Sequence, residues 1–283
     1  NVGRQLLRWL EIFDEQNRLT EKGRQLAQLP CEPRFGHLLS EAKALEQQGY
    51  AGMLSSACYL VALLEERVPG NDPISVQLTR FASSLRPAAQ RWWQRLHGEG
   101  MMSALSVIHT DILAALAWPD RIARQSSELR YQLANGQRAD LIADHPCQGK
   151  EWLVGISLQQ TDYGLRIFTA EPLDIEALAQ IEPTLFREET FLGWDSKEER
   201  VRAEKQCCLG SIVLKRQPLI SLTAEQKAQC LLEGIRQHGL SCLPWDAESE
   251  QWLQRWRCGA EWLPELGLPA VDNVSLLAEL ETW

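Results

Sequence analysis

The sequence predicts an α+β fold, because the spacing of its apolar residues changes twice along the chain. From about residue 34 to residue 117, apolar side chains recur at the 3.6-residue spacing of helices. After Arg124 they fall on every second residue, at Leu129, Tyr131 and Leu133, which is the spacing of a strand. The last part of the chain returns to helical spacing. We therefore expect a helical bundle, a set of strands and a second group of helices.

Composition limits the classes of protein to which the chain can belong. With 283 residues, 45% hydrophobic and 24% charged, it is long enough to bury a large core. The most apolar stretch, residues 52–64, is too short to cross a bilayer, so we do not expect the chain to be a membrane protein. Eight cysteines without a C-x-x-C pair, and five histidines away from ligand spacing, favour reduced thiols in the cytoplasm and no metal site. Phosphate-binding, dinucleotide-binding and hydrolase motifs are absent, so no catalytic residue is expected.

The first half of the chain predicts six helices and one cationic segment. Thr20 is a good N-cap, Gly49 is a good C-cap, and residues 53–66 are apolar on all sides, as in a central bundle helix. Between Pro73 and Gly98 no acidic residue occurs, whereas four arginines flank Trp92-Trp93. The expected helices are 4–13, 21–28, from about 35 to 48, 53–66, 73–97 and 101–117.

The middle of the chain predicts a small barrel of about six strands. Its first hairpin has Asn135-Gly136 at the turn, a pair that favours the type I′ geometry with two positive φ angles. A short helix is expected over 174–181. The strands begin with 129–133 and 139–143 and continue with 152–158, 165–170, 184–194, 201–206 and 209–214.

The end of the chain is helical and acidic. Thr223 and Gln226 form a capping box for a helix that ends at Gly239. Trp252 and Trp256 lie one turn apart on a following helix, and residues 274–280 begin another. Residues 218–283 carry four basic and ten acidic side chains, a net charge of −6.

Several short motifs, taken together, resemble the helicase-associated region of DEAH-type ATP-dependent RNA helicases, and more closely its bacterial HrpB branch. They span residues 1 to about 215. The motifs are Leu19-Thr20-x-x-Gly23, Leu29-Pro30-x-x-Pro33-Arg34, the segments 62–67 (ALLEER), 118–123 (WPDRIA) and 131–136 (YQLANG), Trp194-Asp195, Arg200-Val201 and Leu209-Gly210.

This resemblance implies a domain order and a function. Residues 1–33 would end a winged-helix domain, 34–125 would form a ratchet-like helical bundle, 126–217 an OB-like barrel, and 218–283 a helical extension that leads to a missing C-terminal domain. The chain would be a fragment that holds single-stranded RNA, or another nucleic acid, during ATP-driven translocation. It would contact the motor domains and the C-terminal domain of its parent. ATP and Mg would belong to the missing motor domains, so this chain would have no cofactor and no ATPase activity alone.

The candidate nucleic-acid-binding residues form two groups. Arg86, Arg91, Trp92 and Arg95 could neutralise phosphates and stack on bases, or they could belong to an ordinary packed helix.

The second group lies at the junction between the bundle and the barrel. Arg121 and Arg124 could reach the RNA channel, as the resemblance implies, or they could pair with Asp120 and Glu128 as a clamp between domains.

A different function is also open. The acidic tail and its tryptophans could serve as a protein-docking scaffold, for a partner or for the C-terminal domain of the parent. These tryptophans are Trp245, Trp252, Trp256 and Trp262.

Overall fold

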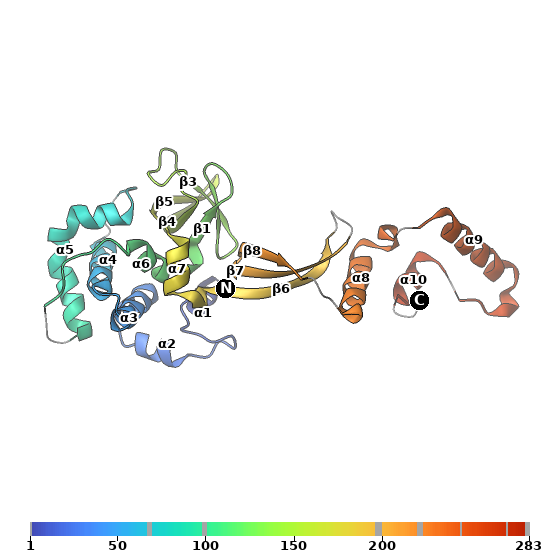
Figure 1. The fold of residues 1–283 in the computed structure, drawn as a ribbon, viewed down its shortest axis with the longest axis horizontal. Coiled ribbons are helices and arrows are strands. Elements are labelled where there is room, and N and C mark those ends of the chain that lie inside the picture. Colours follow the sequence, from blue (N-terminus) through green and yellow to red (C-terminus); the bar gives the residue numbers. More distant parts are fainter. Residues whose placement is uncertain are drawn as a thin grey trace. The chain divides into compact units, whose positions relative to one another are not determined.

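The helices and strands follow the expected α+β pattern in a computed structural model (Figure 1). The structure describes residues 2–66, 70–97, 101–195, 200–219, 223–243, 245–269 and 271–280. They divide into two compact units, Asn1–Arg187 with Cys208–Val213, and Glu188–Cys207 with Leu214–Trp283. No helix within these described ranges is both long and apolar enough to span a bilayer.

The first unit contains a helical bundle whose central helix is α4. Residues 53–63 of α4 are all buried, as its continuous apolar sequence predicts. Thr20 caps α2 through a hydrogen bond from Gly23 N to its Oγ1 (2.9 Å), as expected. The helices are α1 (Val2–Trp9), α2 (Glu21–Leu26), α3 (Pro33–Gln47), α4 (Met53–Glu66), α5 (Ile74–His97) and α6 (Thr110–Ala117).

The expected helix over 101–117 is wrong in its first half. Only α6 is helical, and residues 101–107 lie along α4 as irregular chain. Two serines of α4 bind this segment. Ser103 N donates to Ser55 Oγ (3.2 Å), and Ser56 Oγ donates to the Ser106 carbonyl (2.8 Å). These hydrogen bonds give the backbone of the segment partners that a helix would otherwise supply.

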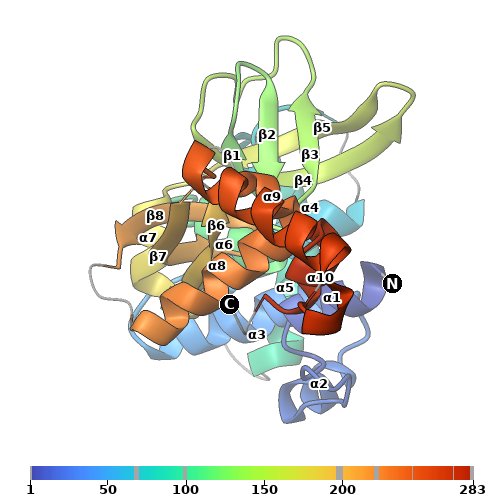
Figure 2. The ribbon, with the colours of Figure 1, turned by 90° about the vertical axis from the view of Figure 1, so that its right-hand side faces the viewer.

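Five strands form a closed barrel in the order β1-β2-β3-β5-β4, and Figure 2 shows β1, β2 and β3 next to one another. All neighbours are antiparallel except β3 and β5, which are parallel. Tyr131, Leu133, Leu153 and Ile167 fill its core and are fully buried. The strands are β1 (Ile122–Gln125), β2 (Arg130–Leu133), β3 (Arg138–Leu141), β4 (Trp152–Thr161) and β5 (Gly164–Pro172).

The barrel differs from the expected one in two respects. It has five strands, because the last three predicted strands form a separate sheet in the order β6-β7-β8, and β1, which was not predicted, joins the first four predicted strands. Its first hairpin turn is not type I′, because Gly136 has a positive φ (88°) whereas Asn135 does not. Gly136 N donates to the Leu133 carbonyl (2.9 Å), so the loop is a three-residue turn that ends in a left-handed glycine.

The bundle is joined to the barrel by polar contacts at the start of α5. Ser75 N donates to Glu171 Oε2 of β5 (3.0 Å), and Thr169 Oγ1 donates to the Gly70 carbonyl (3.1 Å). Glu171 is 5% exposed, and burial raises the pKa of its carboxyl. The N-terminal end of α5 is therefore fixed on the barrel.

The remaining elements are a short helix, the separate sheet and the C-terminal helices. Asp174 caps α7, and Thr223 forms the expected capping box of α8. Gly210, in the turn between β7 and β8, contacts the Ala134 carbonyl and the ring of Trp9 so closely that a Cβ would not fit. The elements are α7 (Ile175–Ile181), β6 (Phe186–Asp195), β7 (Arg200–Leu209), β8 (Ile212–Pro218), α8 (Ala224–His238), α9 (Ala247–Trp262) and α10 (Asn273–Ala278), with short 3-10 turns at η1 (Pro119–Arg121), η2 (Pro183–Leu185), η3 (Leu240–Cys242) and η4 (Pro264–Leu266).

Candidate nucleic-acid interface

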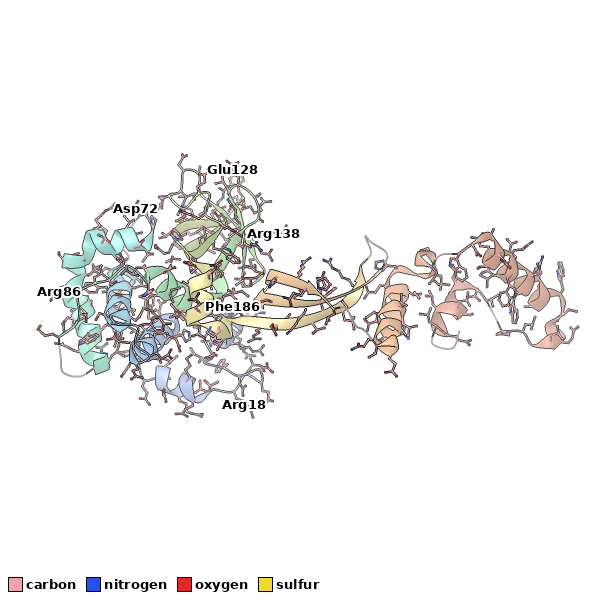
Figure 3. All side chains as sticks on the ribbon, viewed as in Figure 1. Arg18, Asp72, Arg86, Glu128, Arg138 and Phe186 are labelled. Atoms are coloured by element: carbon pink, nitrogen blue, oxygen red, sulfur yellow. The ribbon has the colours of Figure 1, made fainter. Side chains whose placement is uncertain are left out.

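Three predicted arginines lie exposed on α5, and Figure 3 labels Arg86 among them. At 100° per residue, Arg91 and Arg95 are about 40° apart around the helix. Arg86 comes before Pro87, which interrupts the regular helix between them. Arg80, which also comes before Pro87, pairs with Asp72 (2.7 Å). Arg91 and Arg95 thus lie one turn apart, and Arg86 lies on the other side of Pro87. We call Arg86, Arg91 and Arg95 the arginine face.

Both tryptophans of α5 are core residues, as the packed-helix interpretation expects. Trp92 is 5% exposed and Trp93 is 7% exposed. Trp92 Nε1 donates to Glu65 Oε2 of α4 (2.9 Å), and the guanidinium of Arg95 lies 5.0 Å from the centre of its ring. The expected stacking of Trp92 on a base is therefore corrected: its indole ties α5 to α4 and supports Arg95 by a cation–π contact.

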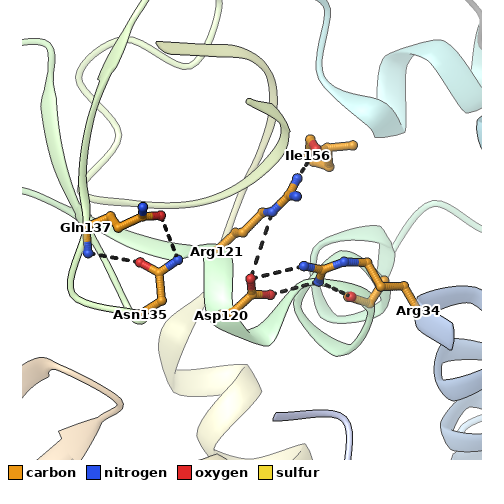
Figure 4. Close-up of polar contacts among 7 residues, drawn as sticks. Arg34, Asp120, Arg121, Asn135, Gln137 and Ile156 are labelled. Atoms are coloured by element: carbon orange, nitrogen blue, oxygen red, sulfur yellow. Dashed lines mark hydrogen bonds and ion pairs between the residues drawn. The ribbon is translucent and has the colours of Figure 1, made fainter. Parts of the chain in front are cut away.

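A buried ion pair, which the sequence analysis missed, holds the junction between the bundle and the barrel (Figure 4). Arg34 of α3 donates to both carboxylate oxygens of Asp120 (2.7 and 3.0 Å) and to the Ala117 carbonyl (2.9 Å). The side chains of Arg34 and Asp120 are only 11% and 13% exposed. Arg34 belongs to the Leu29-Pro30-x-x-Pro33-Arg34 motif. Its partner is 86 positions away in the sequence, so local residue spacing predicts neither its burial nor its ion pair.

Arg121 belongs to the same junction and acts as the clamp interpretation expects. Its Nη1 donates to the Ile156 carbonyl of β4 (2.7 Å), and its Nε lies 4.0 Å from Asp120 (Figure 4). Burial lowers the pKa of its guanidinium, and the nearby charge of Arg34 adds to that effect. The cation of Arg121 is thus directed at the barrel backbone.

Arg124 is also engaged within the first unit, with a partner other than the expected Glu128. It donates to Glu151 Oε1 (3.0 Å), its guanidinium lies 5.4 Å from the centre of the Trp152 ring, and its Nη1 lies 3.4 Å from the Val213 carbonyl. Because 40% of the Arg124 side chain is exposed, a phosphate could reach it. The phosphate would have to compete with Glu151 for the guanidinium. Arg121 and Arg124 thus both make contacts inside the first unit.

His37 lies on the same helix as Arg34 and is 6% exposed. Burial lowers the pKa of its imidazole to about 3, with the charges of Lys22 and Arg34 as further causes. The ring is therefore neutral at physiological pH. Among the described residues, no three histidine, cysteine, aspartate or glutamate side chains are grouped so that they could hold a metal ion.

The comparisons with known proteins agree with the motifs. A family model described as "ATP-dependent RNA helicase HrpB, connector region" matches residues 185–219, which include the strands β6, β7 and β8. ATP-dependent RNA helicase HrpB of Escherichia coli (strain K12) is 36% identical over 273 residues, which are 95% of this chain and 33% of the relative. The expected resemblance to the HrpB branch is confirmed. The chain spans about a third of the length of this curated relative.

Solved structures of the same type share the fold. The crystal structure of the E. coli DExH-box NTPase HrpB is 35% identical, with a TM-score of 0.68, over 99% of this chain and 34% of that one. A crystal structure of the Escherichia coli DEAH/RHA helicase HrpB is 32% identical, with a TM-score of 0.66, over 99% of this chain and 35% of that one. The mixed α and β architecture with its five-stranded barrel is thus an HrpB-type architecture.

Proposed function

We propose that this chain is an accessory module of an HrpB-type ATP-dependent RNA helicase, and that it holds single-stranded RNA while motor domains hydrolyse ATP. ATP and Mg would be bound by those motor domains, and the module would contact them within the same polypeptide in the cytoplasm of a bacterium. The module itself would bind no nucleotide and have no ATPase activity. The 36% identity to an RNA helicase supports the parent activity, but the role of the module depends on its own surface.

The observation that carries this proposal is the arginine face of α5. Its three cations are exposed, and α5 itself carries no acidic residue between Ile74 and His97. Arg91 and Arg95, one turn apart, present two guanidinium groups to a single strand, which is how phosphate groups are commonly bound. The face therefore has the charge and the chemistry for contacts to a nucleic-acid backbone.

The barrel supports the same proposal through its strand order. We propose that the barrel is OB-like, a fold that often binds oligonucleotides, and its order β1-β2-β3-β5-β4 with β3 parallel to β5 supports this proposal. Beside this barrel, we propose that residues 34–125 act as the ratchet-like bundle and that residues 1–33 end a winged-helix domain.

The buried indoles define what kind of contact the arginine face makes. Because Trp92 and Trp93 cannot stack on bases, the face contacts phosphates alone, and phosphate contacts carry little sequence information. Binding should therefore tolerate changes of RNA sequence. With three neutralised phosphates, log K should fall with log salt at a slope of about −2, since each contact to a single strand adds about −0.7.

The test is fluorescence anisotropy of a labelled single-stranded RNA titrated with the chain at several salt concentrations. R91E and R95E together should weaken binding and reduce the salt slope by about 1.4, the share of two phosphate contacts. R255E is the matched control, because Arg255 is also an exposed arginine on a helix but lies in the acidic tail. Equal affinity of the chain and of R91E/R95E would contradict the proposal.

In a longer protein that includes motor domains, the readout is RNA-stimulated ATPase activity. Charge reversal at Arg86, Arg91 and Arg95 should lower this stimulation, while the ATPase rate without RNA should stay unchanged. Unchanged stimulation would favour the second candidate function, a protein-docking scaffold.

The scaffold function is favoured by exposed tryptophans in the acidic tail. Trp252 and Trp262 of α9 are 56% and 74% exposed, and large exposed apolar side chains often mark interaction surfaces. The two candidate functions involve different units of the chain, so both can operate in one protein.

A further inference from the structure

The second unit contains a pocket of about 670 Å³, within the range of ligand-binding sites. Trp252 and Trp256 of α9 form one side, a segment near Pro269 and Val271 forms another, and Leu276 of α10 contributes to the wall. Trp262, which the sequence grouped with these tryptophans, does not line it.

The walls of the pocket are held by hydrogen bonds between α9 and the segment that follows it. Trp256 Nε1 donates to the Pro269 carbonyl (3.1 Å), and Arg257 Nη2 donates to the Val271 carbonyl (2.9 Å). Asp272 then caps α10 by accepting from Val274 N and Ser275 N. The chain between α9 and α10 is thus fixed against α9, and the cavity is built by backbone contacts as well as by side chains.

The lining combines aromatic rings with negative charge. The rings of Trp252 and Trp256 are 5.0 Å apart at 33°, and Trp252 remains 56% exposed. All charged side chains that line the pocket are acidic: Asp246, Glu248 and Glu279. Hydrogen bonds from Ser249 lower the pKa of Asp246, so this carboxylate stays ionised at neutral pH.

This chemistry selects the charge of an occupant. An indole face together with carboxylates attracts a guanidinium, through cation–π and ionic contacts, and repels a phosphate chain. The surrounding residues 218–283 have a net charge of −6, from four basic and ten acidic side chains, so the field around the pocket has the same sign. The apolar part of the wall, with Pro269, Val271 and Leu276, suits aliphatic or proline side chains.

We propose that this pocket binds an extended, arginine-containing apolar segment of a partner protein. The guanidinium lies against Trp252 beside Glu248, and the neighbouring apolar residues pack on Trp256 and Leu276. This function goes beyond RNA holding, and it uses a different unit of the chain. Failure of either proposal therefore leaves the other unchanged.

The experiment is isothermal titration of the full chain with a short synthetic peptide of proline, leucine and arginine. The same peptide with glutamate in place of arginine is the charge control. The arginine peptide should bind with an affinity that falls as salt rises, and the glutamate peptide should not bind. W252A should weaken binding about tenfold or more, since a central tryptophan commonly carries much of the binding energy of an interface.

Two control variants on the same helix, W262A and E250Q, separate the pocket from the rest of α9. W262A removes a more exposed tryptophan outside the pocket and should leave the affinity unchanged. E248Q should weaken binding roughly threefold, whereas E250Q, a change in the same first turn but outside the lining, should not. Far-ultraviolet circular dichroism of W252A and W262A checks that α9 is intact.

Each of the contrary outcomes would overturn the proposal. These outcomes are absence of binding by the arginine peptide, equal binding by the glutamate peptide, an equal loss in W262A and W252A, and displacement of the peptide by single-stranded RNA in the R91E/R95E chain. Binding that depends on Trp252, Glu248 and the arginine of the peptide would support it.

Discussion

The buried ion pair between Arg34 and Asp120 makes a sharp prediction about stability. D120A would leave the guanidinium of Arg34 buried with only the Ala117 carbonyl as a partner. Because both side chains are less than 15% exposed, this loss should cost about 3–5 kcal/mol of unfolding free energy, the usual effect of isolating one buried charge. The measurement is the urea midpoint of the transition that unfolds the first unit.

The chain contains its own control for this experiment. Arg130 and Asp140 on neighbouring strands form the same type of ion pair (2.9 Å), but the arginine side chain is 56% exposed. D140A should therefore change the midpoint little.

A double variant separates loss of charge pairing from loss of packing. R34M with D120L removes both buried charges and should cost less than D120A alone. Equal midpoints for D120A and D140A would refute the argument that burial sets the cost of losing one partner.

Two further predictions concern pH and a glycine. Because burial holds the pKa of His37 at about 3, the unfolded chain binds a proton below pH 6.5 that the folded chain does not. Unfolding free energy should thus fall as pH decreases below 6.5, with a slope that approaches about 1.4 kcal/mol per unit between about pH 5.5 and pH 4, and H37Q should show a smaller slope in urea titrations. G210A should lower the melting temperature more than G164A, although both glycines have positive φ, because a Cβ at Gly210 meets the Ala134 carbonyl and Trp9 whereas one at Gly164 meets nothing within 4 Å. Equal melting temperatures for the two variants would contradict the close packing of the β7–β8 turn.

Local patterns predicted the elements that depend on local physics. Thr20, Asp174 and Thr223 cap helices as their side chains allow, and the apolar residues 53–66 form α4 with the expected limits. Local patterns failed over residues 101–109, where the hydroxyl groups of Ser55 and Ser56 on another helix outweigh an apolar helical pattern. They also failed at Asn135, because the backbone geometry of the turn depends on how its two strands pair.

The candidate site was predicted only in its charge. The absence of acids between Pro73 and Gly98 located the arginine face, but the packing of α5 on α4 decided that Trp92 and Trp93 are buried. Likewise, Arg121 and Arg124 were found as cations at a junction, and the barrel decided that they bind Ile156, Glu151 and Trp152.

The sequence by itself determined the α+β order, the caps of several helices, the uneven charge and the resemblance to the HrpB branch, because each of these depends on residues close together in the chain. Only the tertiary structure decided the closure of the barrel with five strands, the buried pair of Arg34 with Asp120 and the pocket beside Trp252. The physical reason is distance along the chain. Burial and pairing depend on which surfaces meet, and residues 34 and 120 meet only after α3 has packed against α6, which leads into η1.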